Sequence, residues 1–131
     1  MNAFLVDLQN KPGALATITE ALGVKGVNIT NIAGATCGDS GRAAITTADD
    51  AAARSVFQTL KVSFKEFEAT EVSLAHTPGS FGKAARRLAD AGVNIEAILP
   101  TGMAGNNVSV AFVTNNPTKA KEILATATVV R

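Results

Sequence analysis

The sequence predicts the α+β fold class, with two tandem ferredoxin-like βαββαβ modules whose antiparallel sheets each carry their helices on one face. Two observations lead to this prediction. The chain of 131 residues contains an internal repeat, and both copies show the same order of strand-like and helix-like hydrophobic spacing. The expected modules are residues 1–67 and residues 68–131.

The repeat is seen when the chain is shifted by 66 residues. Between positions 6 and 32, ten of 27 residues are identical to their partners, where random pairing would give about one or two. The identical pairs are Val6/Val72, Leu8/Leu74, Pro12/Pro78, Gly13/Gly79, Leu22/Leu88, Gly26/Gly92, Val27/Val93, Asn28/Asn94, Ile29/Ile95 and Ile32/Ile98. A period of this length indicates one folding unit per copy.

The first copy predicts the order strand, helix, strand, strand, helix, strand. Period-two alternation indicates strands, recurrence every three to four residues indicates helices, and glycine or proline separates them. Strands are expected at residues 4–9, 27–32, 43–47 and 63–69. The first helix has the apolar stripe Leu15, Ile18 and Leu22 and ends near Gly26. The second helix is capped by Asp49 or Asp50, and its inner face carries Ala53, Val56, Phe57 and Leu60.

The second copy predicts the same order. Here Thr77 is expected as an N-cap with Pro78 as the first helical residue, and Asn116 and Pro117 as a second such start. Strands are expected at residues 71–75, 93–99 and 127–130, with a further strand that has Val108, Val110 and Phe112 on one face. A turn region is expected at 100–107. The first helix has the stripe Phe81, Ala84, Ala85 and Leu88, and the second has Ile123 and Leu124 inside.

Composition and charge narrow the function classes. Residues 1–66 carry six basic and six acidic residues, and residues 67–131 carry six and five, so neither half is polarised towards nucleic acid or an anionic membrane. The single cysteine, Cys37, cannot form an internal disulfide, nor a zinc site with the lone His76. We expect no cofactor, no metal and no membrane span, and a cytoplasmic location.

Each copy places Pro-Gly between its first strand and first helix, and follows that helix with Gly-Val-Asn-Ile. The first copy has Leu8-Gln9-Asn10-Lys11-Pro12-Gly13-Ala14-Leu15 and then Gly26-Val27-Asn28-Ile29; the second has Leu74-Ala75-His76-Thr77-Pro78-Gly79-Ser80-Phe81 and then Gly92-Val93-Asn94-Ile95. In this arrangement the chain resembles the ACT domain, a βαββαβ module that senses amino acids. The resemblance extends over nearly the whole chain, and its detailed motifs cover the first half of each copy.

The resemblance implies a regulatory, non-catalytic protein that binds a free amino acid where paired modules meet. The physics of the loop agrees, because the first amides of a helix lack internal partners and favour an anion such as a carboxylate. The ligand-binding candidates are Asn10, Lys11, Pro12, Gly13, Ala14, Leu15, Asn28 and Ile29, with His76, Thr77, Pro78, Gly79, Ser80, Phe81, Asn94 and Ile95 in the second copy. Because the copies differ at Asn10-Lys11 and His76-Thr77, the two sites need not be equivalent.

A simpler interpretation stays open at these positions. Pro12-Gly13 is also good strand-to-helix turn chemistry without a ligand, and Asn28 and Asn94 could bond only to the backbone of a turn. Without a visible base–nucleophile partner, His76 is more typical of a surface or capping residue than of a catalyst.

Three other functions compete with the amino-acid sensor as interpretations of the sequence. An enzyme would need a catalytic motif, and none is found. An RNA-binding module would stack bases on strand aromatics, but the third strands carry only Phe112, whose spacing matches core valines. A protein-interaction or assembly module without a ligand remains the main alternative. Small sheets with open edges need cover, so we also expect a homodimer, with a regulated enzyme as a further possible partner.

Overall fold

The structure, a computed structural model, describes residues 1–125. Its contacts group into two compact units, one of residues Asn2–Phe67 and one that runs from Glu68 onward and includes Met1. Each unit has its own apolar core. Within the described part of the chain, no helix combines the length and the apolar character needed to cross a membrane.

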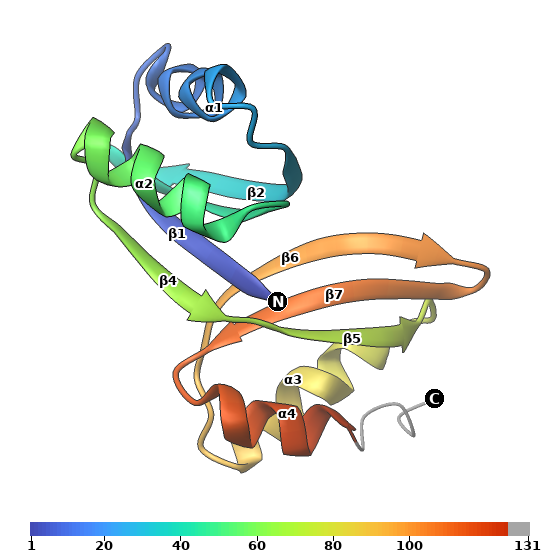
Figure 1. Ribbon diagram of the computed structural model, residues 1–131. Coiled ribbons are helices and arrows are strands. Elements are labelled where there is room, and N and C mark those ends of the chain that lie inside the picture. The colour runs from blue at the N-terminus through green and yellow to red at the C-terminus, as the bar shows by residue number, and fades with distance from the viewer. Residues whose placement is uncertain (126–131) are drawn as a thin grey trace. The chain divides into compact units, whose positions relative to one another are not determined.

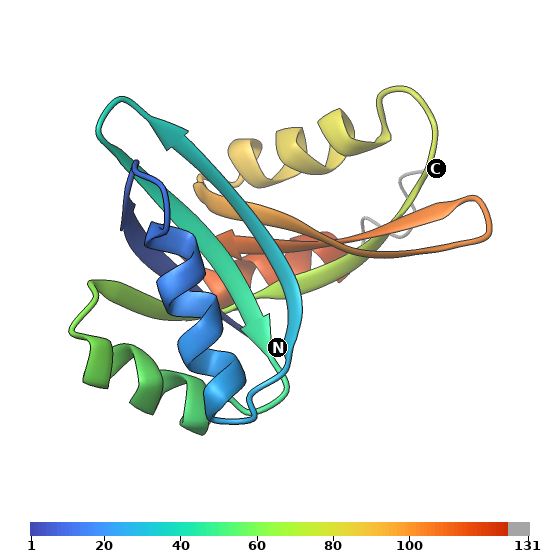
Figure 2. The ribbon, with the colours of Figure 1, turned by 90° about the horizontal axis from the view of Figure 1, so that it is seen from above.

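The first unit is a βαββαβ module. Its elements are β1 (Asn2–Gln9), α1 (Ala14–Val24), β2 (Ile29–Cys37), β3 (Ser40–Thr47), α2 (Asp50–Leu60) and β4 (Phe64–Glu68). The sheet has the order β2-β3-β1-β4, and β3 runs antiparallel to both of its neighbours. Helices α1 and α2 lie on one face of this sheet (Figures 1 and 2).

The core of the first unit lies between the sheet and its two helices. Phe4 and Val6 of β1 pack against Ile18 and Leu22 of α1 and against the α2 residues Ala53, Val56 and Phe57. The prediction for the inner face of α2 is therefore confirmed, as is an aspartate cap, since the Asp49 carboxylate accepts from the Ala52 amide at 3.0 Å. The predicted apolar stripe of α1 is wrong at its first residue, because Leu15 is 44% exposed rather than buried.

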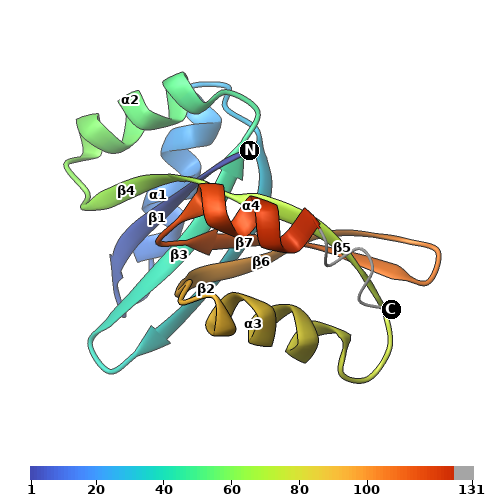
Figure 3. The same ribbon diagram turned by 90° about the horizontal axis from the view of Figure 1, so that it is seen from below.

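The second unit repeats the pattern over its described residues. Its elements are β5 (Thr70–Ala75), α3 (Ser80–Asp90), β6 (Ile95–Ala104), β7 (Asn107–Thr114) and α4 (Pro117–Ala125). The antiparallel sheet has the order β5-β7-β6, with α3 and α4 on one face (Figure 3). Val72, Leu74, Leu88 and Phe112 are buried in its core. The strand predicted at 127–130 lies outside the described residues.

Two local predictions in the second unit are wrong. Residues 100–107 are not one turn region, because β6 continues to Ala104 and only Gly105 and Asn106 form the turn. Helix α3 begins at Ser80 after Gly79, so Thr77 is not its N-cap and Pro78 is not its first residue. Gly79 takes a left-handed conformation with φ 88°, which glycine adopts without steric cost. The turn therefore includes Gly79, and the helix begins only at the next residue. In α4 the predicted cap is confirmed: the Asn116 side chain accepts from the Lys119 amide at 3.1 Å.

The two copies keep the 66-residue offset only up to the middle of β6. In β5 and β7, Thr70 pairs with Phe112, whereas in β1 and β3 the equivalent Phe4 pairs with Ile45. The offset is thus 66 for the first strands and 67 for the third strands. The extra residue is absorbed by an irregularity in β6 between Pro100 and Gly102 that β2 lacks. Thr101 sits at this bulge, and its hydroxyl is buried without a partner among the described residues.

An ion pair joins α2 to β4 in the first unit. Arg54 donates to both carboxylate oxygens of Glu66, at 2.6 and 2.9 Å, and the Asn2 amide donates to the same carboxylate at 2.7 Å. The hydrogen bond from Arg54 is the main reason that the pKa of Glu66 lies below its ordinary value.

This lowered pKa predicts a pH dependence of stability. A carboxyl whose pKa is lowered by folding contributes stability above its unfolded pKa, about 4.3 for Glu, and loses that contribution as the pH falls through the folded pKa. Glu66→Gln should therefore be less stable than the wild type at neutral pH, and the difference should vanish in acid. Urea denaturation at several pH values measures this difference in the free energy of unfolding. Glu68→Gln, an exposed position on the same strand, is the control; an equal effect from both variants would contradict the prediction.

Candidate functional site

The loop between the first strand and first helix has the same backbone in both units. Gly13 and Gly79 each have φ 88° and ψ −12° and directly precede the helix. The backbone N–H of Asn10 donates to the Asp39 carbonyl at 2.9 Å, and the backbone N–H of His76 donates to the Asn106 carbonyl at 2.7 Å. Each loop is thereby tied by a backbone hydrogen bond to the turn of the following hairpin, and its last residue has a φ that favours glycine.

An open cleft lies beside this loop in the first unit. Its volume is about 430 Å³, and it is bounded by the end of β1, the first turn of α1, β2 and one residue of β3. The lining residues are Leu8, Gln9, Asn10, Lys11, Ala14, Leu15, Ile32, Ala33, Gly34, Ala35, Thr36 and Ala43. Four of the predicted site residues, Asn10, Lys11, Ala14 and Leu15, are thus brought together around one space.

Apart from Gln9, Thr36 and the loop residues Asn10 and Lys11, the lining of the cleft is apolar. Leu15 on α1 is 44% exposed and Ile32 on β2 is 43% exposed. Large aliphatic side chains are usually buried, and only six large hydrophobic residues are this exposed in the described part of the chain. Ile32 and Gly34 lie opposite Ile45 and Ala43 of β3, so they share the helix-facing side of the sheet. Between these walls, Gly34 and Ala43 leave space because they have no bulky side chains.

Polar groups gather at the α1 end of the cleft. The amides of Leu15 and Ala16, in the first turn of α1, donate to no other described residue, as expected for a helix start without a capping side chain. Lys11 is exposed, and no ion pair to it is found among the described residues. The Asn10 side-chain nitrogen donates to the Gly38 carbonyl at 2.8 Å, and no hydrogen bond to the Asn10 side-chain oxygen is found among the described residues.

Other predicted residues of the first copy lie elsewhere. Pro12 and Gly13 shape the loop but do not line the cleft. Asn28 and Ile29 follow the C-terminal end of α1, opposite to the end beside the cleft. The Asn28 carbonyl accepts from the Ala48 amide at 2.9 Å, and Ile29 packs against the core, so both have structural contacts. Conversely, Ile32, Gly34, Thr36 and Ala43 line the cleft but were not among the predicted ligand-binding residues. A small-residue pattern in β2 and β3 was the available signal.

The same positions in the second unit carry larger side chains. Through the offsets of 66 and 67, Ala14 corresponds to Ser80, Leu15 to Phe81, Gly34 to Pro100 and Ala43 to Val110. The Phe81 ring stacks on that of Phe112 with 5.6 Å between centroids. The Ser80 hydroxyl bonds to the Ala75 carbonyl and reaches the Thr77 carbonyl at 3.1 Å. The second unit therefore has bulkier side chains at the positions that correspond to the cleft lining of the first.

The remaining candidates of the second copy are distributed in the same way. His76, Thr77, Pro78 and Gly79 form the exposed loop. Asn94 and Ile95 follow the far end of α3: the Asn94 amide donates to the Asn115 side chain at 3.0 Å, and Ile95 packs on the core.

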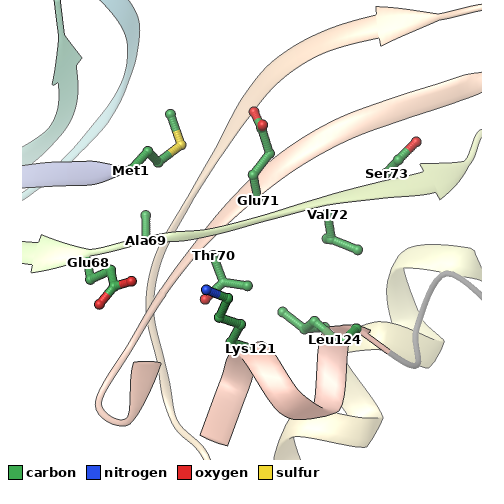
Figure 4. Close-up of a pocket in the computed structure, with 10 residues that line it drawn as sticks. Met1, Glu68, Ala69, Thr70, Glu71, Val72, Ser73, Lys121 and Leu124 are labelled. Carbon is green, nitrogen blue, oxygen red and sulfur yellow. The ribbon is translucent and has the colours of Figure 1, made fainter. Parts of the chain in front are cut away.

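A second cleft, of about 370 Å³, lies in the second unit between β5 and α4. Figure 4 shows Thr70 and Val72 pointing towards α4, with Lys121 beside Thr70, while Glu71 and Ser73 point away from the helix. None of the predicted site residues lines this cleft. It adjoins Ala125, the last described residue. The first cleft is therefore the stronger candidate for a ligand site.

The described residues define an ACT-type fold, two tandem ferredoxin-like modules, with an open cleft beside the strand-to-helix loop of the first. Known structures share this fold. The chain matches a Bacteroides thetaiotaomicron protein with a TM-score of 0.76 and 23% identity, covering 95% of this chain and 85% of that one. It also matches the ligand-free regulatory subunit of aspartate kinase from Thermus thermophilus, with a TM-score of 0.63, 20% identity, and 96% and 90% coverage.

A third match is the structure of aspartokinase alpha and beta subunits, with a TM-score of 0.65, 18% identity, and coverage of 97% of this chain and 93% of that one. No protein-family model and no curated protein matches the sequence. At these identities the likeness establishes the fold, so the predicted fold class and the resemblance to ACT modules are confirmed at that level.

Proposed function

We propose that this protein is a non-catalytic regulatory protein that binds a free amino acid in the cleft of its first unit. The observation that carries the proposal is the cleft itself. It combines apolar walls at Leu15 and Ile32 with helix-start amides that have no partner in the described part of the chain. A concave, mostly apolar site with a few convergent polar groups is typical of small-molecule binding.

The polar end of the cleft suits the two charges of a free amino acid. The ligand carboxylate would accept hydrogen bonds from the Leu15 and Ala16 amides, where the dipole of α1 is positive, and Lys11 would add a cation. The ligand ammonium group would donate to the Asn10 side-chain oxygen, since the side-chain nitrogen of Asn10 already donates to the Gly38 carbonyl. Alternate backbone groups of β2, an edge strand, offer further partners.

The structural neighbours support a regulatory role. One of them is described as the regulatory subunit of aspartate kinase in its ligand-free form. By analogy we propose that ligand binding here alters a partner, such as an enzyme, rather than driving chemistry within this chain. The residues that line the cleft agree with this, because they include no histidine, cysteine or carboxylate that could act as a nucleophile or as its base.

A thermal-shift screen of the twenty amino acids, followed by calorimetry, tests the proposal. Binding to the folded state alone adds about 2.7 kcal/mol of stability at a hundredfold excess over Kd, so a true ligand should raise the Tm clearly. Because the corresponding positions of the second unit carry bulkier side chains, calorimetry should give one ligand per chain. If no amino acid shifts the Tm at about millimolar concentration, the assembly module without a ligand becomes the better interpretation.

We further propose that the protein works in the cytoplasm as a homodimer. The sheet edges at β2 and at β6 have no second neighbour among the described strands, and free strand edges favour association. Light scattering at about micromolar concentration tests the dimer. A monomeric mass would remove that part of the proposal and leave the ligand site unaffected.

A further inference from the structure

We infer that the first-unit cleft selects an α-amino acid whose side chain is uncharged and apolar. This inference rests on the proposed function and adds the chemical class of the ligand. It comes from the distribution of charge and apolar surface around the cleft. One end suits the α-carboxylate and ammonium groups, and the mostly apolar walls suit a hydrocarbon side chain.

The exposed side chains of Leu15 and Ile32 define where the ligand side chain lies. They stand on α1 and β2, on two sides of the same cleft, and each leaves more than two-fifths of its surface to solvent. Small residues, Ala33, Gly34 and Ala43, complete this part of the lining. A hydrocarbon side chain placed there removes its own apolar surface and that of both walls from water, which favours binding in proportion to the area buried.

Charge in the lining argues against basic and acidic side chains. No Asp or Glu lines the cleft, so the side-chain ammonium of a dibasic ligand would lose water without gaining a counter-ion. Lys11 is the one cation of the lining, and it stands at the loop where the α-carboxylate would be held. A second carboxylate among Leu15, Ile32 and Ala43 would therefore have no charged partner.

A homologous ligand series tests this inference without altering the protein. Alanine, 2-aminobutyrate, norvaline and norleucine add one methylene at a time, and calorimetry should show the affinity rising about fourfold per methylene. Lysine differs from norleucine by little more than its terminal ammonium, and should bind much more weakly. If lysine or glutamate binds more tightly than norleucine, or the series is flat, the ligand class is wrong while the amino-acid site stands. If none of these ligands binds, both proposals fail.

Ile32→Glu provides an independent test from the protein side. The residue is 43% exposed on an edge strand, so a charged side chain there should be tolerated. A carboxylate at this wall should reverse the preference, with lysine binding at least about tenfold more tightly relative to norleucine than in the wild type. Val24→Glu, at an 85% exposed position near the far end of α1, is the matched control. An unchanged norleucine-to-lysine ratio in folded Ile32→Glu would place the ligand side chain elsewhere and overturn the inference.

Discussion

Phe57→Ala is expected to destabilise the first unit by about 3–5 kcal/mol, the cost of emptying a buried aromatic position, and to abolish amino-acid binding with it. Phe57 lies on α2 and is completely buried. Its ring meets Phe4 of β1 at 5.2 Å and Phe64 of β4 at 5.4 Å between centroids. It therefore joins the helix layer to two neighbouring strands of a unit that is small enough for this loss to approach its total stability.

The internal repeat supplies a matched control for Phe57→Ala. At the offset of 67 residues its counterpart is Leu124 on α4, which is 2% exposed and packs in the core of the second unit. Leu124→Ala should cost about 2–5 kcal/mol, but in the unit that does not carry the proposed site. Urea denaturation followed by circular dichroism measures the loss of unfolding free energy in both variants. Calorimetry on each full-length variant measures ligand binding.

Together the two variants locate the binding function. Binding lost in Phe57→Ala and kept in Leu124→Ala would assign the ligand site to the first unit. The opposite pattern would assign it to the second unit, against the argument from Ser80 and Phe81. The contrast is informative because both substitutions remove buried hydrocarbon at equivalent positions and neither residue lines the cleft.

The fold was predictable because its signals are local and occur twice. Strands alternate, helices show their apolar stripes, and Pro-Gly marks the same junction in each copy. The helix starts were less predictable where backbone geometry competes with capping chemistry. Thr77-Pro78 has the composition of a helix start, but Gly79 can take a left-handed turn that few other residues adopt at low cost, and α3 starts after it.

The register of the second unit could not be obtained from the repeat alone. A one-residue insertion changes which side chains share a face, because successive strand residues point to opposite sides. In β6 the bulge at Thr101 absorbs the insertion, so Val110 of β7, rather than Ser109, takes the place that Ala43 has in β3. Sequence identity between the copies has faded at this point, and only the pairing of strands shows where the extra residue lies.

The candidate site was predictable only in part, for a related reason. The loop residues Asn10 and Lys11 follow from the Pro-Gly motif, and both line the cleft. Whether a cleft exists depends on residues far away in the sequence, namely Gly34 on β2 and Ala43 on β3. Helical spacing placed Leu15 in the core, but the helix period cannot show that the sheet beneath it carries small residues there.

Leu15→Asp is expected to weaken amino-acid binding by about a hundredfold or more while leaving the fold intact. Leu15 is the second residue of α1, where a carboxylate stabilises a helix by about 0.3–1 kcal/mol through the dipole. The same carboxylate would occupy the positive end of the helix, where the ligand carboxylate is proposed to lie. Measured against the similarly shaped Leu15→Asn, the charge should thus raise stability while it lowers affinity, which general damage to the unit cannot produce.

Leu15→Asn separates charge from lost apolar contact. Asparagine has nearly the shape of aspartate and removes the same leucine side chain, so it should weaken binding by only about tenfold. The excess loss in Leu15→Asp should shrink as salt is added, because repulsion between two carboxylates at a partly exposed site is screened. Equal losses in the two variants, independent of salt, would mean that no ligand carboxylate lies beside the start of α1. The amides of Leu15 and Ala16 would then be free of partners for a reason other than ligand binding.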